Sequence, residues 1–163
     1  MSSQLKNLSK YTNHIPSAKG IRFGIVISEW NQEITEALFQ GAYTTLIENK
    51  AEENKITKKY VPGSFELTLG AQLFAERKDI DVIICLGCII QGETKHFDFI
   101  SQALANGLTD LNIKYKKPVI FGVLTTDNLQ QAKDRSGGKH GNKGVEAAVT
   151  AVKMVALRRK FKD

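Results

Sequence analysis

The stretch DVIICLGCII at residues 81–90, followed directly by QGETKHFD at residues 91–98, is the most informative part of this chain. The first segment is an almost unbroken apolar run rich in β-branched residues, which predicts a strand buried on both faces of a parallel sheet. The second segment turns at Gly92 and predicts a helix with Thr94 as its N-cap. His96 is then expected in the first helical turn, beyond the carboxyl end of a central strand, where open α/β sheets bind ligands.

The same order of strand and helix recurs along the chain. Further strands are predicted at 21–28, 55–61 and 119–125, and further helices at about 31–46, 65–77, after 128, and at 145–161. Such alternation predicts an α/β fold with a parallel sheet and helices on both of its faces. The polar composition of the strand at 55–61 indicates a position near a sheet edge.

Length and hydropathy indicate one domain without a membrane span. The chain has 163 residues, which is the size of a single domain. Residues 1–20 are polar and predict an N-terminal arm, which leaves residues 21–163 as one α/β domain. No apolar run approaches the ~20 residues of a membrane helix, and the arm lacks the apolar core of a secretory signal. We therefore expect a cytoplasmic protein without a membrane partner.

The net charge of +6 raises the question of nucleic-acid binding. Part of the excess lies within residues 158–162, at the end of the last predicted helix, where cations offset the helix dipole. Basic and aromatic residues do not interleave in a recognisable RNA-binding pattern. We expect no nucleic-acid partner, and an anionic small-molecule substrate fits the charge equally well.

Cys85 and Cys88 form a C-x-x-C within the predicted central strand. Residues three apart on a strand point to opposite faces, so we expect two buried structural thiols and no disulfide. Two cysteines also cannot complete a four-ligand zinc site, and no metal site is expected.

Four short loops follow the four predicted strands, at residues 28–31, 62–66, 92–96 and 125–128. Because the carboxyl ends of parallel strands lie along one edge of the sheet, these loops should share a rim. Trp30, the only tryptophan of the chain, lies in the first loop. It either stacks on a planar ligand or covers the edge of the core, and the sequence favours neither alternative.

Three other features of the sequence each allow two interpretations. His96 is either a structural histidine or a proton-transfer group, and its place beyond a strand favours the second. Glu66 either stabilises a helix dipole or hydrogen-bonds a polyol. The glycine-rich segment 135–144 carries Arg135 and several other cations just before the last helix. It either binds phosphate through its backbone amides, without Walker spacing, or is a flexible connector.

Four blocks, in order and at matching spacing, carry a family resemblance. They are VPGSFE at 61–66, GETKHFD at 92–98, FGVLTT at 121–126, and Arg135 followed by KHGNKG at 139–144. On these blocks the region 21–157 resembles the 6,7-dimethyl-8-ribityllumazine synthase family. The resemblance implies a flavodoxin-like, three-layer α/β/α sandwich with a central four-stranded parallel sheet.

The resemblance also implies an activity. Members of this family are transferases of riboflavin biosynthesis. They condense 5-amino-6-(D-ribitylamino)uracil with 3,4-dihydroxy-2-butanone 4-phosphate to 6,7-dimethyl-8-ribityllumazine, phosphate and water, the penultimate step of the pathway. The reaction needs neither a metal nor an organic cofactor.

Family roles carry over to matching positions of this chain. His96 matches the proton-transfer residue, and the phosphate site matches Arg135 together with Gly92, Glu93 and Thr94. The residues that match the pyrimidine and ribityl site are Trp30, Ser64, Phe65, Glu66, Ile89, Ile90, Phe121 and Lys143. Phe121, Lys143 and Arg135 match residues that enter the site from a neighbouring subunit.

Two positions depart from the family pattern. Trp30 stands where phenylalanine is common, which enlarges the surface on which the pyrimidine stacks. Phe65 stands where many members have tryptophan, which removes an indole donor near the ribityl chain.

Family members assemble as homopentamers or as icosahedral capsids of sixty subunits. The resemblance gives the segment 5–15 the task of adding a strand to the sheet of a neighbouring subunit. The segment 135–144 lacks the insertion of the pentamer-only fungal form, which favours the shell. Some members enclose riboflavin synthase, which makes that enzyme a candidate partner.

Three other functions compete with this interpretation. One is a flavin-binding or shell-forming relative with a decayed site, and another is a flavodoxin-like module that senses phosphate. The third is the archaeal relative that makes riboflavin directly from the lumazine. The intact His96, Arg135 and Lys143 argue against the first.

Overall fold

The computed structural model describes residues 7, 9–10 and 14–161, and its core is one parallel sheet. The sheet has the order β2-β1-β3-β4, and all three neighbouring pairs run parallel. Its strands are β1 (Phe23–Ser28), β2 (Ile56–Val61), β3 (Val82–Ile90) and β4 (Val119–Thr126). The predicted α/β fold with four parallel strands is confirmed, and each strand boundary lies within two residues of its prediction.

The position of each strand follows from its composition. β3 is apolar on both faces and buried from Val82 to Ile89, so it lies in the centre of the sheet. β2 has no fully buried residue and lies at an edge, as its polar sequence predicts. Lysines on an edge strand also discourage pairing with other chains.

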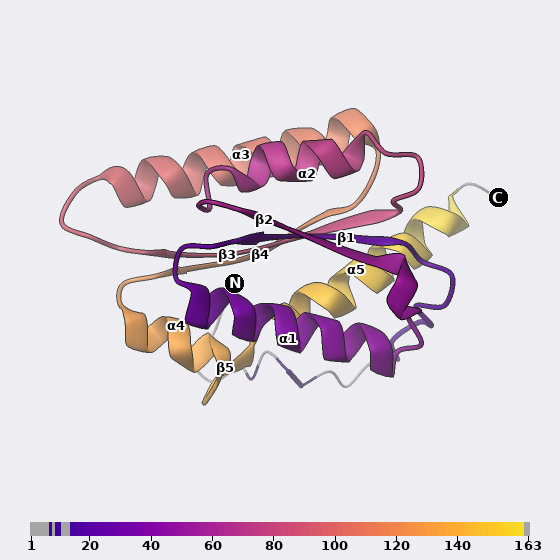
Figure 1. Ribbon diagram of the computed structural model, residues 1–163, viewed down its shortest axis with the longest axis horizontal. Coiled ribbons are helices and arrows are strands. Elements are labelled where there is room, and N and C mark those ends of the chain that lie inside the picture. The colour runs from indigo at the N-terminus through magenta and orange to yellow at the C-terminus, as the bar shows by residue number, and fades with distance from the viewer. Residues whose placement is uncertain (1–6, 8, 11–13, 162–163) are drawn as a thin grey trace.

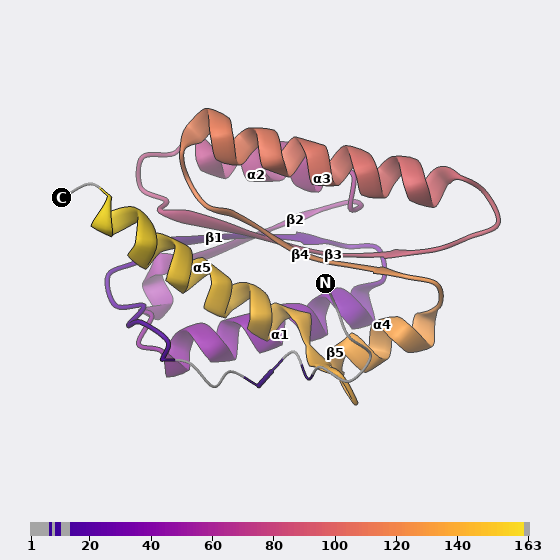
Figure 2. The same ribbon diagram turned by 180° about the vertical axis from the view of Figure 1, so that it is seen from behind.

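Five α-helices cover the sheet in two layers (Figures 1 and 2). Their bounds are α1 (Gln32–Glu48), α2 (Leu67–Ala75), α3 (His96–Tyr115), α4 (Leu129–Arg135) and α5 (Lys143–Lys160), and a short 3₁₀ turn spans Glu53–Lys55. Helices α2 and α3 lie on one face, and α1, α4 and α5 lie on the other. The molecule is therefore a three-layer α/β/α sandwich, as expected.

Each face of the sheet has its own apolar core. Leu38 of α1 and Val152 of α5 belong to one core, and Leu67 of α2 and Leu104 of α3 belong to the other. Burying one such aliphatic side chain stabilises the fold by about 1.5–3 kcal/mol.

The two cysteines of β3 lie in different cores. Cys85 belongs to the core under α2 and α3, and Cys88 to the core under α1 and α5. Both thiols are free and buried, so the prediction of structural thiols is confirmed. Burial raises the pKa of both, that of Cys88 to about 11.

Three helix starts differ from their predictions, and α5 begins at Lys143, two residues before the predicted start at 145. Helix α3 begins at His96 with Lys95 in the N-cap position, and Thr94 instead accepts a hydrogen bond from His96 N–H at 3.3 Å. Helix α2 begins at Leu67 with Glu66 in the N-cap position, two residues later than predicted. The delay arises because residues 63–66 form a turn, closed by a hydrogen bond from Gly63 N–H to the Glu66 carboxylate.

The glycine-rich segment is an ordered hairpin and not a flexible connector. Strands β5 (Ser136–Gly138) and β6 (Gly141–Asn142) pair antiparallel. The buried Asn142 side chain donates to Ala37 O at 2.9 Å and to Ser136 O at 3.1 Å, and accepts from Gly144 N–H at 2.7 Å. These bonds fix the hairpin against α1 and cap α5.

The described part of the predicted arm packs on its own domain. Ala18 is buried, and its N–H donates to Asn49 O at 2.8 Å. Ser9 Oγ accepts a hydrogen bond from Asn142 N–H at 2.9 Å. Most of the segment 5–15, which is expected to pair with a neighbour, lies outside the described residues, and the boundary between arm and domain stays a prediction. Among the described helices, none is both long and apolar enough to cross a membrane.

Candidate active site at the carboxyl ends of the strands

A cavity of about 470 Å³ opens where β1, β2 and β3 end. Parallel strands direct their carboxyl ends to this edge, and the loops that follow them form the walls. The residues that line it are Trp30, Asn31, Gly63, Ser64, Phe65, Glu66, Cys88, Ile89, Ile90, His96 and Ile100. The structure thus brings together seven of the thirteen predicted site residues, from four separate segments of the chain.

His96 is the one imidazole in the lining of this cavity. It is the first residue of α3 and is exposed. The next residue, Phe97, and Ile100, one turn along the helix, pack toward the core. The bond to Thr94 Oγ1 satisfies the His96 backbone N–H. An exposed imidazole on a rigid helical turn can accept and return a proton to a group bound in the cavity.

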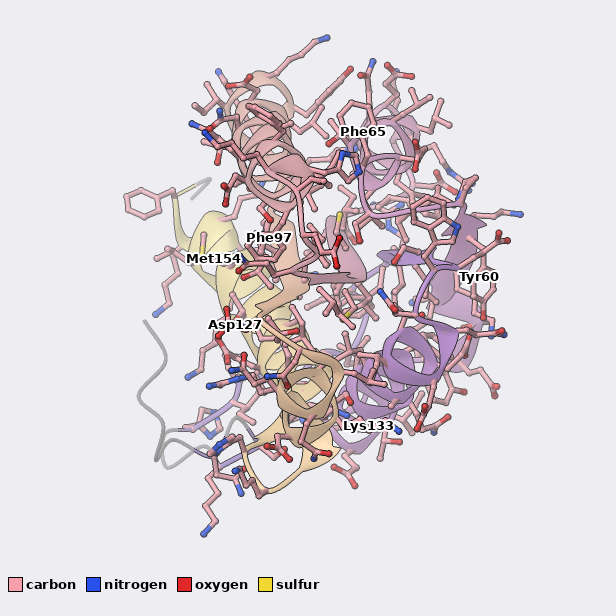
Figure 3. The ribbon with its side chains drawn as sticks, turned by 90° about the vertical axis from the view of Figure 1, so that its left-hand side faces the viewer. Tyr60, Phe65, Phe97, Asp127, Lys133 and Met154 are labelled. Carbon is pink, nitrogen blue, oxygen red and sulfur yellow. The ribbon has the colours of Figure 1, made fainter. Side chains whose placement is uncertain are left out.

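Two large aromatic rings stand at the mouth of the cavity. Trp30 is 70% exposed and Phe65 is 55% exposed, which excludes the alternative that Trp30 covers the edge of the core. Figure 3 shows Phe65 on the α2 side of the sheet, away from Lys133 on α4. Exposed aromatic faces beside a cavity provide a surface on which a planar ligand can stack.

Glu66 closes the turn from which the second wall is built. Its Oε2 accepts the hydrogen bond of Gly63 N–H at 3.0 Å. A carboxylate has about four acceptor positions, so it can still accept hydroxyl groups of a polyol. The structure thus holds Glu66 in place and leaves acceptor capacity at the cavity.

Gly87 and Ser28 lie close to Ser64, which lines the cavity, but they are not themselves lining residues. A Cβ atom on Gly87 of β3 would lie 2.8 Å from both Leu67 Cδ1 and Ser64 Oγ and 3.3 Å from Ser28 Oγ, so these side-chain ends would have to shift to admit it. Ser64 and Ser28 are buried, and Ser28 Oγ has no hydrogen-bond partner. A buried hydroxyl without a partner is a position where an ordered water can bind.

The predicted phosphate loop, Gly92, Glu93 and Thr94, joins β3 to α3 at the same edge. All three residues are exposed, and they come directly before the positive end of a helix of 20 residues. Nothing lies within 4 Å of a Cβ on Gly92, so an anion has room to approach the backbone there.

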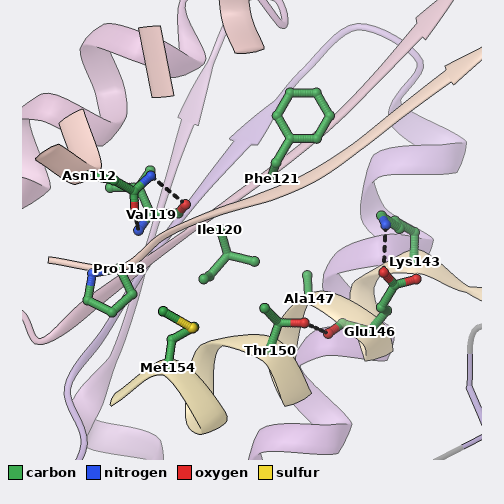
Figure 4. Close-up of a pocket in the computed structure, with 10 residues that line it drawn as sticks. All are labelled: Asn112, Pro118, Val119, Ile120, Phe121, Lys143, Glu146, Ala147, Thr150 and Met154. Atoms are coloured by element: carbon green, nitrogen blue, oxygen red, sulfur yellow. Dashed lines mark hydrogen bonds and ion pairs between the residues drawn. The ribbon is translucent and has the colours of Figure 1, made fainter. Parts of the chain in front are cut away.

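Phe121 and Lys143 line a different hollow of about 330 Å³, along the edge strand β4 and between α3 and α5 (Figure 4). Lys143 Nζ pairs with Glu146 Oε1 at 2.8 Å in this hollow. Within one chain, these two residues therefore do not join the His96 cavity.

Arg135 ends α4 and lines neither of these two cavities. Its neighbour Asp134 is paired with Lys139 at 3.3 Å. The hydrogen bond from Gln130 is the main cause that lowers the pKa of Asp134, and the Lys139 ammonium lowers it further. This carboxylate therefore remains ionised. Lys139 is thus already paired, whereas the Arg135 guanidinium has the shape to bind a phosphate with two hydrogen bonds.

Four residues of the cavity wall were not predicted as site residues. They are Asn31, Gly63, Cys88 and Ile100. Asn31 and Gly63 lie in two of the loops that were predicted to share the rim, and Cys88 directly precedes the predicted Ile89, so position in the sequence could have found these three. Among the described residues, no three metal-binding side chains come together.

Comparison with known proteins assigns the family. The sequence model of the 6,7-dimethyl-8-ribityllumazine synthase family matches residues 20–159. The relative from Cytophaga hutchinsonii, with that name, is 58% identical over 156 residues, which is 96% of this chain and 98% of the relative. Relatives of the same name from Flavobacterium johnsoniae and Parabacteroides distasonis are 52% and 51% identical, over 98% and 95% of this chain and over 84% and 98% of their own lengths.

Proposed function

The chain belongs to the 6,7-dimethyl-8-ribityllumazine synthase family, and on this premise we propose how its residues divide the work of the reaction. The enzyme is a transferase of riboflavin biosynthesis. It condenses 5-amino-6-(D-ribitylamino)uracil with 3,4-dihydroxy-2-butanone 4-phosphate to 6,7-dimethyl-8-ribityllumazine, phosphate and water.

The pyrimidine binds against Trp30, with its ribityl chain along Ser64, Phe65 and Glu66. Support comes from the lining of the cavity, where an exposed indole faces a wall that ends in a fixed carboxylate. Ile89 and Ile90 continue β3 into the cavity, so their backbone groups can meet the edge of the ring. Stacking supplies affinity, and hydrogen bonds supply specificity.

The butanone phosphate binds with its phosphate at Gly92, Glu93 and Thr94, at the N-terminal end of α3. The exposed backbone and the helix end support this place. Arg135 completes the phosphate site from a second copy of the chain. Support for a second copy comes from the separation of Arg135, Phe121 and Lys143 from the His96 cavity in one chain.

His96 moves the protons. The amino group of the pyrimidine attacks the ketone, and loss of water gives an imine. Phosphate then leaves, and the second amine closes the ring with loss of water. Each step needs a proton taken from nitrogen or carbon and one given to a leaving oxygen, which an imidazole near neutral pH can supply in turn.

Assembly follows from the incomplete site. A ring of five copies would give each cavity a neighbour, and we propose a homopentamer that forms part of a shell of sixty subunits. Riboflavin synthase is a candidate for enclosure in that shell. The two unpaired thiols fit a reducing compartment, and we propose that the enzyme works in the cytoplasm.

The observation that carries this assignment is His96 in one cavity with Trp30 and Glu66. The test is a rate assay that follows lumazine absorbance, with a protein-free reaction as the baseline. His96→Ala should slow the catalysed reaction by ~10²–10⁴-fold. Gln102→Ala, at an exposed position of the same helix outside the cavity, is the control and should keep the wild-type rate.

Two results would contradict the assignment. A wild-type rate equal to the protein-free rate would remove the activity. An unchanged rate in His96→Ala would remove the role of His96 and leave the activity intact.

A further inference from the structure

Asn31 has an unusual backbone and an unusual hydrogen bond. It occupies the N-cap position of α1 with φ 60° and ψ 44°, in the left-handed region, where asparagine is tolerated better than most side chains. Its side chain makes no capping bond to α1. Instead, Asn31 Nδ2 donates to Cys88 O of β3 at 3.0 Å.

This bond joins β1 and β3 just beyond the point where their backbone pairing ends. The ladder between β1 and β3 ends at the pair Ile27 and Leu86. Cys88 lies two residues further along β3, and the β1 chain has by then left the sheet for the loop. The Asn31 amide therefore extends the connection between β1 and β3 to the edge of the cavity.

Trp30 lies between this bond and the turn after β2. The backbone N–H of Trp30 donates to Pro62 O at 3.2 Å. The indole atom Cε3 lies 3.5 Å from the place that a Cβ on Gly63 would take. The backbone thus ties Trp30 to the end of β2, and the Asn31 amide ties the next residue to β3. An exposed ring keeps one orientation only if the backbone that carries it is held on both sides.

We propose that Asn31 is a positioning residue, whose amide bond to Cys88 O holds the Trp30 indole in the orientation that stacks on the pyrimidine. The proposal rests on the assignment of Trp30 to the pyrimidine. It makes the bond act on binding of the pyrimidine more than on binding of the butanone phosphate, because the phosphate loop begins at Gly92, four residues after Cys88 and past the end of β3 at Ile90.

The test compares Asn31→Asp with Asn49→Asp, at opposite ends of α1. Asn49 is the C-cap of the helix, and its amide also donates to a backbone carbonyl, Thr45 O at 2.7 Å. Asn31→Asp replaces a donor by an acceptor that faces Cys88 O, while the helix dipole favours a carboxylate at an N-terminus. Asn49→Asp puts the same carboxylate at the unfavourable end, far from the cavity.

The two variants should therefore behave in opposite ways. Asn31→Asp should raise KM for the pyrimidine about five- to tenfold, change KM for the butanone phosphate less than about twofold, and keep the melting temperature. Asn49→Asp should lower the melting temperature and keep both KM values. Asn31→Gly keeps the left-handed backbone without the donor and should also raise the pyrimidine KM about fivefold.

A readout without substrate separates this proposal from the assigned activity. Trp30 is the only tryptophan, so time-resolved fluorescence anisotropy reports its ring alone. Asn31→Asp and Asn31→Gly should increase its fast local motion, and Asn49→Asp should not. Unchanged motion in both Asn31 variants would overturn the proposal. So would a wild-type pyrimidine KM in Asn31→Gly, or an equal rise of both KM values in Asn31→Asp.

Discussion

Glu66 Oε2 lies 3.0 Å from Gly63 N and accepts its hydrogen bond, so the wall that should face the ribityl chain is fixed before any ligand binds. The same bond delays the start of α2 and leaves Ser64 and Phe65 in the turn. A group that is already held loses little conformational freedom when it binds a polyol.

Gly63→Ala tests this turn. The new Cβ would lie 3.0 Å from Glu66 Oε2, so the carboxylate must shift, and 3.5 Å from Trp30 Cε3, in ordinary contact with the indole. We expect KM for the pyrimidine to rise about tenfold while KM for the butanone phosphate stays constant, measured by steady-state kinetics with each substrate varied in turn. Equal effects on both constants would contradict the separate subsites.

Arg135→Ala tests the phosphate site. We proposed that the Arg135 guanidinium binds the phosphate with charge-assisted hydrogen bonds, so its loss should raise KM for the butanone phosphate by about 10–100-fold and leave KM for the pyrimidine unchanged. Lys133→Ala is the matched control on the same helix, since Lys133 pairs with Glu33 at 3.1 Å. A similar effect of both variants would indicate loss of general positive charge and not of a phosphate contact.

Mixed assemblies test the shared site. In the proposed arrangement, His96→Ala and Arg135→Ala damage different halves of a site that two copies form. Co-expression of the two variants in equal amounts should restore wild-type sites at about a quarter of the interfaces, because about half of the copies keep His96 and about half of their neighbours keep Arg135. The check is the specific activity of the mixture against that of each variant. Activity no higher than the mean of the two variants would place both residues in one subunit.

Gly144→Ala tests how closely α5 packs on α1. A Cβ on Gly144 would lie 1.9 Å from Leu38 O, and a backbone carbonyl cannot move aside as a side chain can. We expect a loss of about 3–5 kcal/mol in the free energy of unfolding, measured with urea, or failure to fold. Thr150→Ala, at an exposed position of α5, should stay within about 0.5 kcal/mol of the wild type.

The buried thiol of Cys88 predicts a pH dependence of stability. Burial raises its pKa from about 9 to about 11, so the folded protein keeps the proton over a range in which the unfolded chain loses it. Stability is therefore complete below about pH 9 and falls as the pH rises toward 11, by up to about 1.4 kcal/mol per unit. Urea unfolding at about pH 8 and about pH 10 should show a smaller loss for Cys88→Ala than for the wild type. Equal losses would contradict the prediction.

Features that depend on nearest neighbours along the chain were predictable. The apolar run of β3, the alternation of strands and helices, and the place of His96 one residue into α3 all follow from periodicities that are visible in the sequence. The opposite faces of Cys85 and Cys88 follow from the same two-residue period. Helix starts were less predictable, because the bond between Gly63 and Glu66 competes with the first turn of α2.

Features that depend on distant segments were not predictable. The Asn31 amide could cap α1 locally, and it bonds Cys88 O, 57 residues away, because the strand order brings β3 beside β1. Asn142 likewise bonds Ala37 O, which turns a glycine-rich segment into a fixed hairpin. A polar side chain has many acceptable partners in an unfolded chain, and packing of the sheet leaves it one. The sequence therefore specified the kinds of group at the site, and the folded sheet selected which of them meet in one cavity.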